Sequence, residues 1–216
     1  MRRDSSSLEK LLENPHLWRG HGQAHTVPGL SSGYEALDRH LPGGGWPQCS
    51  LTEILVEHYG IGELRLLMPA LATLSAEHGN TENANYAEPG WIAWVAPPFQ
   101  PYPPALQQWG INLSRMLIVR PKNDSEMLWS AEQALSSGTC AAVLLWPDAL
   151  DDQASRRLQL AAEKGNSWAI AFRPPMARTE PSAAALRIEL LSSGEGTRLH
   201  ILKSRGGRPA VLHDVI

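Results

Sequence analysis

The sequence lacks several features that would assign a chain to a familiar class. It has only two cysteines, Cys49 and Cys140, so it offers neither a disulfide framework nor the cysteine spacing of a metal site. Both adjoin expected strands, and we expect them to be small buried residues. Residues 1–10 contain no apolar stretch typical of a signal peptide, and no apolar run is long enough to span a membrane. We therefore expect a cytoplasmic protein with no membrane association and no bound metal.

Positive charge is also scarce. The formal net charge is -3 at pH 7, so the chain as a whole is not attracted to nucleic acid. A chain of 216 residues can bury a hydrophobic core without disulfide cross-links. We expect a short amphipathic helix and linker over residues 1–28 and a compact domain over residues 29–216. The eight tryptophans lie mostly in or beside apolar runs, and Trp18 and Trp46 are candidates for contact surfaces.

Hydrophobic patterning predicts an α/β domain. Short apolar runs bounded by breakers predict strands at 51–56, 91–96, 115–120, 140–146, 167–172, 186–191, 197–203 and 209–215. Helical spacing predicts helices at 34–40, from Glu63 onward, and at 104–109, 124–137 and 151–164. Because βα units come first and strands alone come last, we expect a mostly parallel twisted sheet. Helices should flank it on both faces, with antiparallel strands at the C-terminal end.

The first expected strand leads into a glycine turn and a helix, which is the layout of a phosphate-binding P-loop. That loop needs G-x-x-x-x-G-K-[ST], where the lysine neutralises phosphate and the hydroxyl holds magnesium. The corresponding residues 57–64 read Glu-His-Tyr-Gly-Ile-Gly-Glu-Leu. Gly60 and Gly62 supply the turn, but Glu63 replaces the lysine and Leu64 replaces the hydroxyl.

This exchange reverses the electrostatics of the loop. Backbone N–H groups at a helix N-terminus attract an anion, and Glu63 supplies that anion internally. A phosphate about 4 Å from this carboxylate would be repelled by roughly 4 kcal/mol at an effective dielectric of about 20. The stretch is either a nucleotide site that has lost its function or an ordinary strand–turn–helix that never bound a nucleotide.

The order and spacing of several motifs resemble a known family. The motifs are residues 30–38 (LSSGYEALD), 43–47 (GGGWP), 51–54 (LTEI), 91–96, 109–117, 141–146 and 197–203. Together they resemble the RecA recombinase core across roughly residues 29–216. Within the RecA-like proteins, the runs GIGELRLL (60–67) and WIAWVAPP (91–98) are most similar to the ImuA family of bacterial mutasome operons. Residues 91–120 are also similar to the cell-division inhibitor SulA.

The resemblance implies a RecA-like, P-loop NTPase-type core whose nucleotide site is degenerate. The Walker B aspartate of the family corresponds to Trp146, and its catalytic glutamate corresponds to Pro98. With Glu63 and Leu64, four parts of the ATP chemistry are missing together. Phosphoryl transfer depends mainly on positioning and charge neutralisation. We therefore expect no ATPase activity, no catalytic residue and no cofactor.

The resemblance also implies a function. It indicates a non-catalytic adaptor of the SOS response to DNA damage that takes part in translesion synthesis and induced mutagenesis. The implied partners are a Y-family polymerase-like mutasome protein of the ImuB type, an error-prone replicative-type polymerase, and RecA. The alternatives are a SulA-like inhibitor of cell division and a RecA-like ATPase or recombinase. Residues 30–54 and the full set of C-terminal strands favour the ImuA interpretation over SulA.

Two regions are candidates for partner contacts. Leu8, Leu11 and Leu12 form an apolar stripe on a helix too short to be stable alone, and Trp18 follows in the linker. Such a tethered segment docks in a groove of its own domain or of a partner.

The second region is basic. Lys203 and Arg205 match the pair that reaches a neighbouring subunit's nucleotide in recombinase filaments, or else they are an ordinary charged strand end. Strand alternation places His200 and Leu202 on one face and Lys203 on the other.

DNA contact is expected to be weak or indirect. The connection after the strand at 167–172 carries Arg173 and Arg178 but no aromatic residue for base stacking. It is either a residual contact with single-stranded DNA or a solvated loop.

Overall fold

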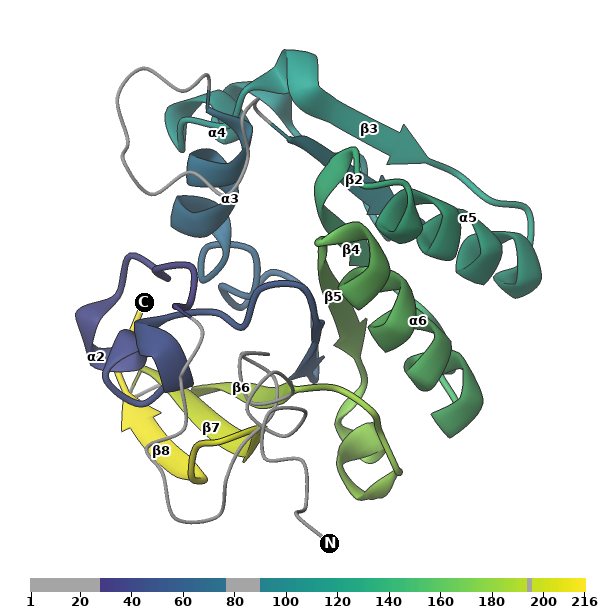
Figure 1. Ribbon diagram of the computed structural model, residues 1–216. Coiled ribbons are helices and arrows are strands. Elements are labelled where there is room, and N and C mark those ends of the chain that lie inside the picture. Colours follow the sequence, from purple (N-terminus) through teal and green to yellow (C-terminus); the bar gives the residue numbers. More distant parts are fainter. Residues whose placement is uncertain (1–27, 77–89, 194–195) are drawn as a thin grey trace, which may run out of the picture.

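The computed structural model, which describes residues 28–76, 90–193 and 196–216, contains an eight-stranded sheet (Figure 1). Its strands are β1 (Leu51–Val56), β2 (Trp91–Val95), β3 (Met116–Val119), β4 (Cys140–Leu145), β5 (Trp168–Arg173), β6 (Leu186–Ser193), β7 (Gly196–Ser204) and β8 (Ala210–His213). The order across the sheet is β3-β2-β4-β5-β1-β6-β7-β8. Strands β1 to β6 pair in parallel, whereas β7 and β8 are antiparallel. The expected mostly parallel sheet with antiparallel C-terminal strands is confirmed.

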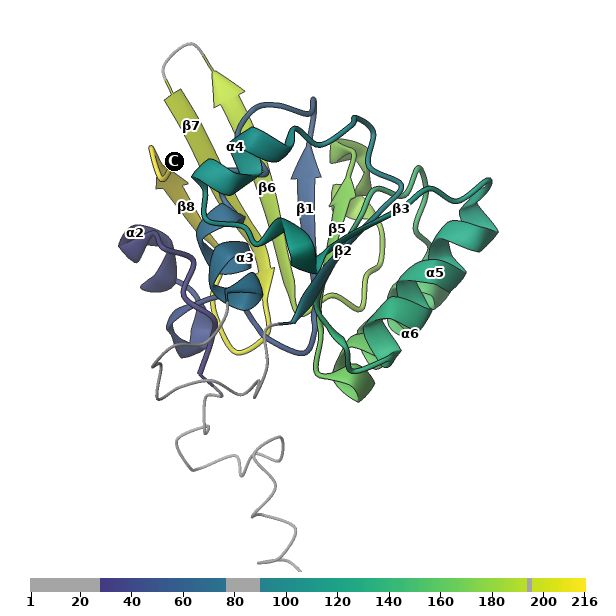
Figure 2. The same ribbon diagram turned by 90° about the horizontal axis from the view of Figure 1, so that it is seen from above.

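Helices cover both faces of this sheet, as the alternation of strands and helices predicted. The α-helices are α2 (Glu35–Asp38), α3 (Met68–Ser75), α4 (Pro103–Gln108), α5 (Asp124–Ser136) and α6 (Asp152–Gly165), and the 3-10 helices are η1 (Pro42–Gly44), η2 (Leu113–Arg115) and η3 (Pro175–Thr179). Helices α3 and α4 lie on one face, and α5 and α6 pack side by side on the other (Figures 1 and 2).

Side-chain caps define the ends of the two long helices. Asn123 accepts a hydrogen bond from the backbone N–H of Glu126 (2.9 Å) before α5, and Asp151 accepts one from Ala154 (2.6 Å) before α6. Each cap satisfies an N–H group that has no partner within its helix. Helix α6 ends where Asn166 adopts a left-handed conformation (φ 51°).

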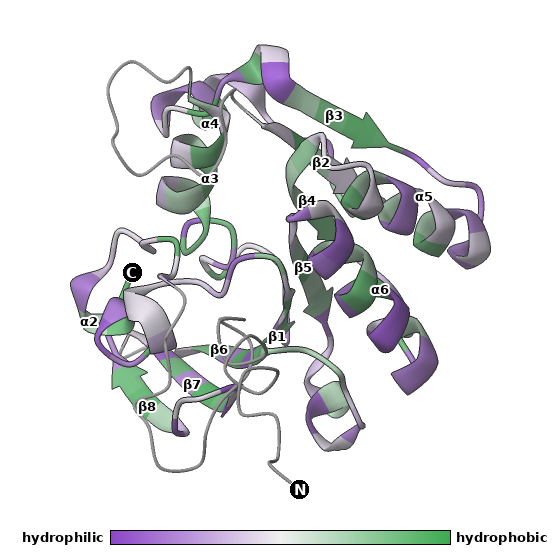
Figure 3. Cartoon of the chain, in the orientation of Figure 1, coloured by the Kyte–Doolittle hydropathy of each residue, from purple (hydrophilic) through white to green (hydrophobic). Residues whose placement is uncertain are grey.

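Strands β1, β4 and β5 are buried along their whole length because both faces of the sheet are covered there, and most of their residues are hydrophobic (Figure 3). The face beneath α3 includes Trp46 and Trp168, whose ring centroids lie 5.3 Å apart. The Trp168 indole also donates to the Thr52 hydroxyl (3.0 Å). Trp46 is fully buried, so the expectation that it belongs to a contact surface was wrong.

The helix after the glycine turn begins later than expected. Residues 63–67 form hydrogen-bonded turns, including a bond from the Leu66 N–H to the Gly62 carbonyl (2.9 Å), and α3 starts at Met68. Pro69 lacks an N–H and fits the first turn of a helix better than its interior. It therefore lies at the start of α3 instead of kinking a longer helix.

Part of the predicted organisation falls outside the described residues. Leu8, Leu11, Leu12 and Trp18 belong to residues 1–27, so the N-terminal contact segment and the boundary at residue 28 stay predictions. Within the described ranges, no helix is long and apolar enough to cross a membrane. The same residues contain no cluster of three or more His, Cys, Asp or Glu side chains suited to a metal ion.

Candidate functional site

The glycine loop that follows β1, residues 57–64, lies where open α/β sheets usually bind ligands, at the carboxyl ends of parallel strands. Figure 2 shows the ends of β1 and β2 on the side of the molecule where α4 lies. A cavity of about 340 Å³ occupies this region. Its lining residues are Tyr59, Gly60, Glu63, Leu64, Arg65, Met68, Trp94, Pro97, Pro98, Phe99, Gln100, Pro101, Tyr102, Ala105, Leu106, Trp109 and Trp146. The structure thus brings Gly60, Glu63, Leu64, Pro98 and Trp146 together around one cavity.

The Glu63 carboxylate accepts a hydrogen bond from the backbone of its own loop. Its two oxygens accept the Gly60 N–H at 2.9 and 3.0 Å, and the residue is only 4% exposed. A P-loop offers such N–H groups to phosphate. Here the Gly60 N–H donates to the Glu63 carboxylate of the same loop. Glu63 is the internal anion that the sequence predicted at this position.

Gly62 has a steric role in the same loop. Its φ of 112° is a conformation that side-chain-bearing residues rarely adopt, and a Cβ added there would lie 2.5 Å from Cδ1 of Ile216. The backbone conformation of the turn therefore explains the requirement for glycine, without any reference to a nucleotide.

Trp146 fills the position at which the resemblance places a magnesium-binding acid. The residue follows β4, is mostly buried, and stacks on Phe172 with ring centroids 4.8 Å apart and an interplanar angle of 15°. Trp94 of β2 packs against its indole at 5.4 Å. An indole held by two rings is a hydrophobic packing unit that offers no carboxylate oxygen to a cation.

Aromatic side chains form much of the wall of this cavity, and sequence reasoning missed them. Phe99, Tyr102 and Trp109 are among the exposed large hydrophobic residues of the described chain. They come from the segment that follows β2 and from the residues of and beside α4. The signal in the sequence was the run Pro-Pro-Phe-Gln-Pro-Tyr-Pro-Pro at 97–104, which places aromatic residues on a proline-stiffened backbone.

Two carboxylates lie near enough to Tyr59, at one side of the cavity, to affect its ionisation. Burial raises the pKa of the Tyr59 phenol, and the carboxylates of Asp148 and Glu63 raise it further. Each of these carboxylates is negatively charged and therefore opposes the formation of a negative charge on the Tyr59 phenol oxygen. Arg65 is the one cationic side chain among the lining residues given above.

Arg173 does not fit the expected contact with DNA. It ends β5, is 2% exposed, and forms ion pairs with Glu180 (2.6 Å) and Glu53 (3.6 Å). Arg178 is more exposed, but its guanidinium pairs with Glu189 (2.9 Å). Arg173 therefore serves a network inside the protein, whereas Arg178 forms its ion pair at the surface. The expectation of a nucleic-acid contact at Arg173 is corrected by its burial.

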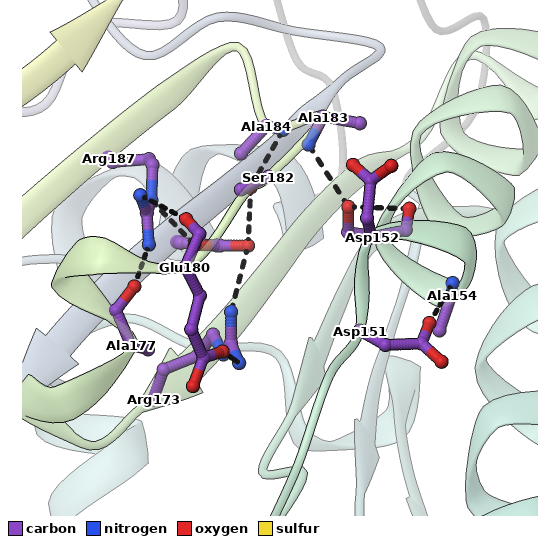
Figure 4. A network of polar contacts seen from close by, with 12 residues as sticks. Asp151, Asp152, Ala154, Arg173, Ala177, Glu180, Ser182, Ala183, Ala184 and Arg187 are labelled. Atoms are coloured by element: carbon purple, nitrogen blue, oxygen red, sulfur yellow. Dashed lines mark hydrogen bonds and ion pairs between the residues drawn. The ribbon is translucent and has the colours of Figure 1, made fainter.

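The centre of this network is the fully buried Glu53 on β1. Its carboxylate accepts hydrogen bonds from Nε of Arg187 (2.8 Å) and from the Ser182 hydroxyl (2.6 Å). Figure 4 shows Arg187 and Arg173 facing the segment between β5 and β6. Arg187 also donates to the backbone carbonyls of Ala177 (2.6 Å) and Glu180 (3.2 Å). This segment is thus held against the sheet by buried charges, unlike a solvated loop.

A β-bulge changes the predicted orientation of Lys203. The pairing of β6 with β7 shifts between Arg187 and Ile188, so that Arg187 lies opposite Lys203 while Ile188 lies opposite Ile201. A bulge inserts one residue and moves the next side chain to the other face. Lys203 consequently lies on the face of Arg187, not with Ile201, and the predicted alternation fails at this point.

Lys203 and Arg205 are exposed, and each contacts a segment that is distant in the sequence. The Lys203 ammonium donates to the Ser182 carbonyl (2.9 Å). Partial burial lowers its pKa, and the nearby positive charges of Arg205 and Arg187 lower it further. The Arg205 guanidinium lies 3.8 Å from the Glu163 carboxylate on α6.

Comparison with known proteins bears on the family. A family model described as cell division inhibitor SulA matches residues 65–169. Protein ImuA of Caulobacter vibrioides (strain NA1000 / CB15N) is 28% identical over 209 residues, which cover 87% of this chain and 83% of that protein. The chain is similar to ImuA over most of its length and to SulA over a shorter part. This confirms the resemblance to the ImuA family, with the more distant one to SulA, that the motifs indicated.

The similarity to SulA covers a smaller part of the chain than the similarity to ImuA. SulA of Photorhabdus laumondii subsp. laumondii is 31% identical over 131 residues, covering 59% of this chain and 66% of the relative. The family-model match, which ends at residue 169, contains most of the cavity and none of β6 to β8. A crystal structure of SulA from Pseudomonas aeruginosa aligns with 57% of this chain and 97% of its own, at 27% identity and a TM-score of 0.44. That score is too low for an argument about the fold.

Proposed function

We propose that this chain is a non-catalytic adaptor of the SOS response to DNA damage, acting in translesion synthesis and induced mutagenesis. The observation that carries the proposal is the Glu63 carboxylate on the Gly60 N–H, which occupies the loop that would otherwise receive phosphate. The similarity to ImuA over most of the chain supports the biological role. An adaptor needs a stable surface and no nucleotide chemistry, which agrees with the packed indole of Trp146.

We further propose that the domain is a degenerate RecA-like core. In support, the strand that precedes the glycine loop, β1, lies inside the sheet between β5 and β6. The residues that follow β1, β2 and β4 line a common cavity. This is the arrangement that a nucleotide site at the carboxyl ends of parallel strands requires. The residues proposed to have lost that chemistry are Glu63, Leu64, Pro98 and Trp146.

The full chain is expected to bind no magnesium-ATP and to hydrolyse none. Isothermal titration calorimetry with ATP and magnesium should show only heat of dilution, because Glu63 opposes phosphate and no acid occupies position 146. A double variant, Glu63→Lys with Leu64→Thr, restores two of the four missing groups and should still not hydrolyse ATP. Tight ATP binding by the parent chain would contradict the loss of the nucleotide site.

The proposed partners are a Y-family polymerase-like mutasome protein, an error-prone replicative-type polymerase and RecA. Contact with DNA is weak or indirect in this proposal, since the one cationic side chain of the β5–β6 segment that is well exposed, Arg178, already pairs with Glu189. The candidate contact residues are Leu8, Leu11, Leu12 and Trp18 together with Lys203 and Arg205. The exposure of Lys203 and Arg205 supports the second group.

Reversing the charges of Lys203 and Arg205 is expected to weaken partner capture several-fold. In a pull-down with purified RecA and the polymerase-like protein, Lys203→Glu with Arg205→Glu should retain less of one or both, because like charges would then face the partner. Deletion of residues 1–20 should weaken capture independently. Arg156→Glu with Arg157→Glu is the matched control, since it reverses two exposed charges on α6. Equal capture by all variants would exclude this contact model.

Inhibition of cell division is the second candidate function. It is favoured by the SulA family model over residues 65–169 and by the similarity to SulA of Photorhabdus laumondii. Expression in undamaged bacterial cells separates the two functions. Filamentation in the absence of DNA damage would favour the inhibitor, whereas normal division with increased damage-induced mutation would favour the adaptor.

A further inference from the structure

The cavity at the degenerate loop has walls of an unusual kind. Six aromatic side chains line it: Tyr59, Trp94, Phe99, Tyr102, Trp109 and Trp146. Aliphatic contacts come from Leu64, Met68 and Leu106. Its volume of about 340 Å³ is within the range of pockets that hold a ligand or an inserted side chain, roughly 300–1,000 Å³. A surface of this composition is typical of a binding site and not of a solvated cleft.

The charges around the cavity favour a cation over an anion. The faces of aromatic rings are electrically negative and attract ammonium or guanidinium groups that come within about 6 Å. Glu63 is one of the lining residues, and its carboxylate and that of Asp148 are both near enough to Tyr59 to oppose its ionisation. Arg65, the cation among the lining residues, is exposed, so its charge is screened by solvent. An anionic nucleotide would meet Glu63 at the loop, as argued above.

We propose that this cavity binds an arginine side chain of a protein partner. The three methylene groups of arginine match the apolar walls, and its planar guanidinium stacks on aromatic faces while it pairs with a carboxylate. Glu63 would then have two tasks, because it accepts the Gly60 N–H and supplies the negative charge at the cavity. The inference goes beyond the adaptor function, since recognition of the cation is measurable without any mutasome protein.

The first test compares two peptides that differ only in charge. Acetyl-Gly-Arg-Gly-amide and acetyl-Gly-citrulline-Gly-amide have nearly the same shape, but the citrulline side chain is neutral. Both are titrated into the full chain labelled with ¹⁵N, and the indole N–H signals are assigned with single Trp→Phe variants. The arginine peptide should shift the signals of Trp94, Trp109 and Trp146 saturably. The citrulline peptide should bind about tenfold more weakly, which is the order expected for loss of a cation–π contact and its paired charge.

Matched variants locate the effect. Glu63→Gln keeps a carbonyl oxygen for the Gly60 N–H and removes the charge, so it should reduce arginine binding about tenfold and leave citrulline binding unchanged. Asp148→Asn changes an exposed residue and should also weaken arginine binding. It serves as the second test in case Glu63→Gln alters the fold. Trp109→Ala should weaken both peptides, whereas Trp129→Ala, on the exposed face of α5 and outside the cavity, should affect neither.

Three results would overturn the proposal. They are equal affinity for the arginine and citrulline peptides, indole shifts outside the cavity only, and no shift up to the solubility limit of the arginine peptide. None of them would contradict the adaptor function, because an adaptor can use other surfaces. Conversely, the chain could bind arginine specifically and capture no mutasome protein. That result would support the proposed arginine site and contradict the proposed adaptor function.

Discussion

Replacing Glu53 with alanine is expected to lower the free energy of unfolding by about 3–5 kcal/mol. The carboxylate is fully buried on β1, between β5 and β6, and lies 2.8 Å from Arg187 and 3.6 Å from Arg173. Its removal leaves two buried guanidinium groups without their shared anion. A buried charge that loses its partner keeps the cost of desolvation without the compensating attraction. Urea unfolding followed by circular dichroism measures the effect.

Two controls separate the buried charge from a general loss of contacts. Arg39→Ala breaks an exposed ion pair with Glu35 on α2 and should cost less than about 1 kcal/mol. Glu53→Leu combined with Arg187→Met removes both partners and should recover part of the stability lost in Glu53→Ala, because apolar replacement of a buried pair is often close to neutral. If Glu53→Ala unfolds with the parent midpoint, the network does not hold the β5–β6 segment in place.

Replacing Trp146 with alanine is expected to cost about 3–5 kcal/mol, the usual range for large-to-small changes of buried aromatic residues. The indole stacks on Phe172 and contacts Trp94, so its removal opens a cavity that continues into the pocket at the glycine loop. Thermal and urea unfolding both measure the loss. Trp129→Ala is the matched control, because Trp129 is 62% exposed, and its change should stay within about 0.5 kcal/mol.

The variant Trp146→Asp tests the same position from the opposite direction. It restores the acid that the RecA resemblance places there, but it puts a carboxylate against two aromatic rings. The stability should fall at least as far as in Trp146→Ala, since a charged group without a partner is costly in an apolar environment. Calorimetry should still detect no magnesium-ATP binding. Recovery of ATP binding by this one substitution would indicate a nucleotide site that is nearly intact.

The sequence by itself determined the elements and much of the sheet. The run Leu51–Val56 and its counterparts predicted eight strands because buried parallel strands are apolar along their length. Connection type predicted which strands are parallel, since a crossover helix returns the chain in the same direction. The glycine turn and Glu63 after the first strand were also visible locally, because such a loop consists of a few consecutive residues.

Only the tertiary structure decided which charged and aromatic side chains are exposed. Arg173 was predicted to be a basic loop residue, yet it is buried and pairs with Glu53, which is distant in the sequence, and with Glu180 of the segment that follows β5. Trp46 is fully buried for the same kind of reason, since Trp168 of β5 packs against it. The side on which Lys203 lies depended on a bulge between β6 and β7. Burial and register are set by long-range neighbours, whereas periodicity records only the local preference of the chain.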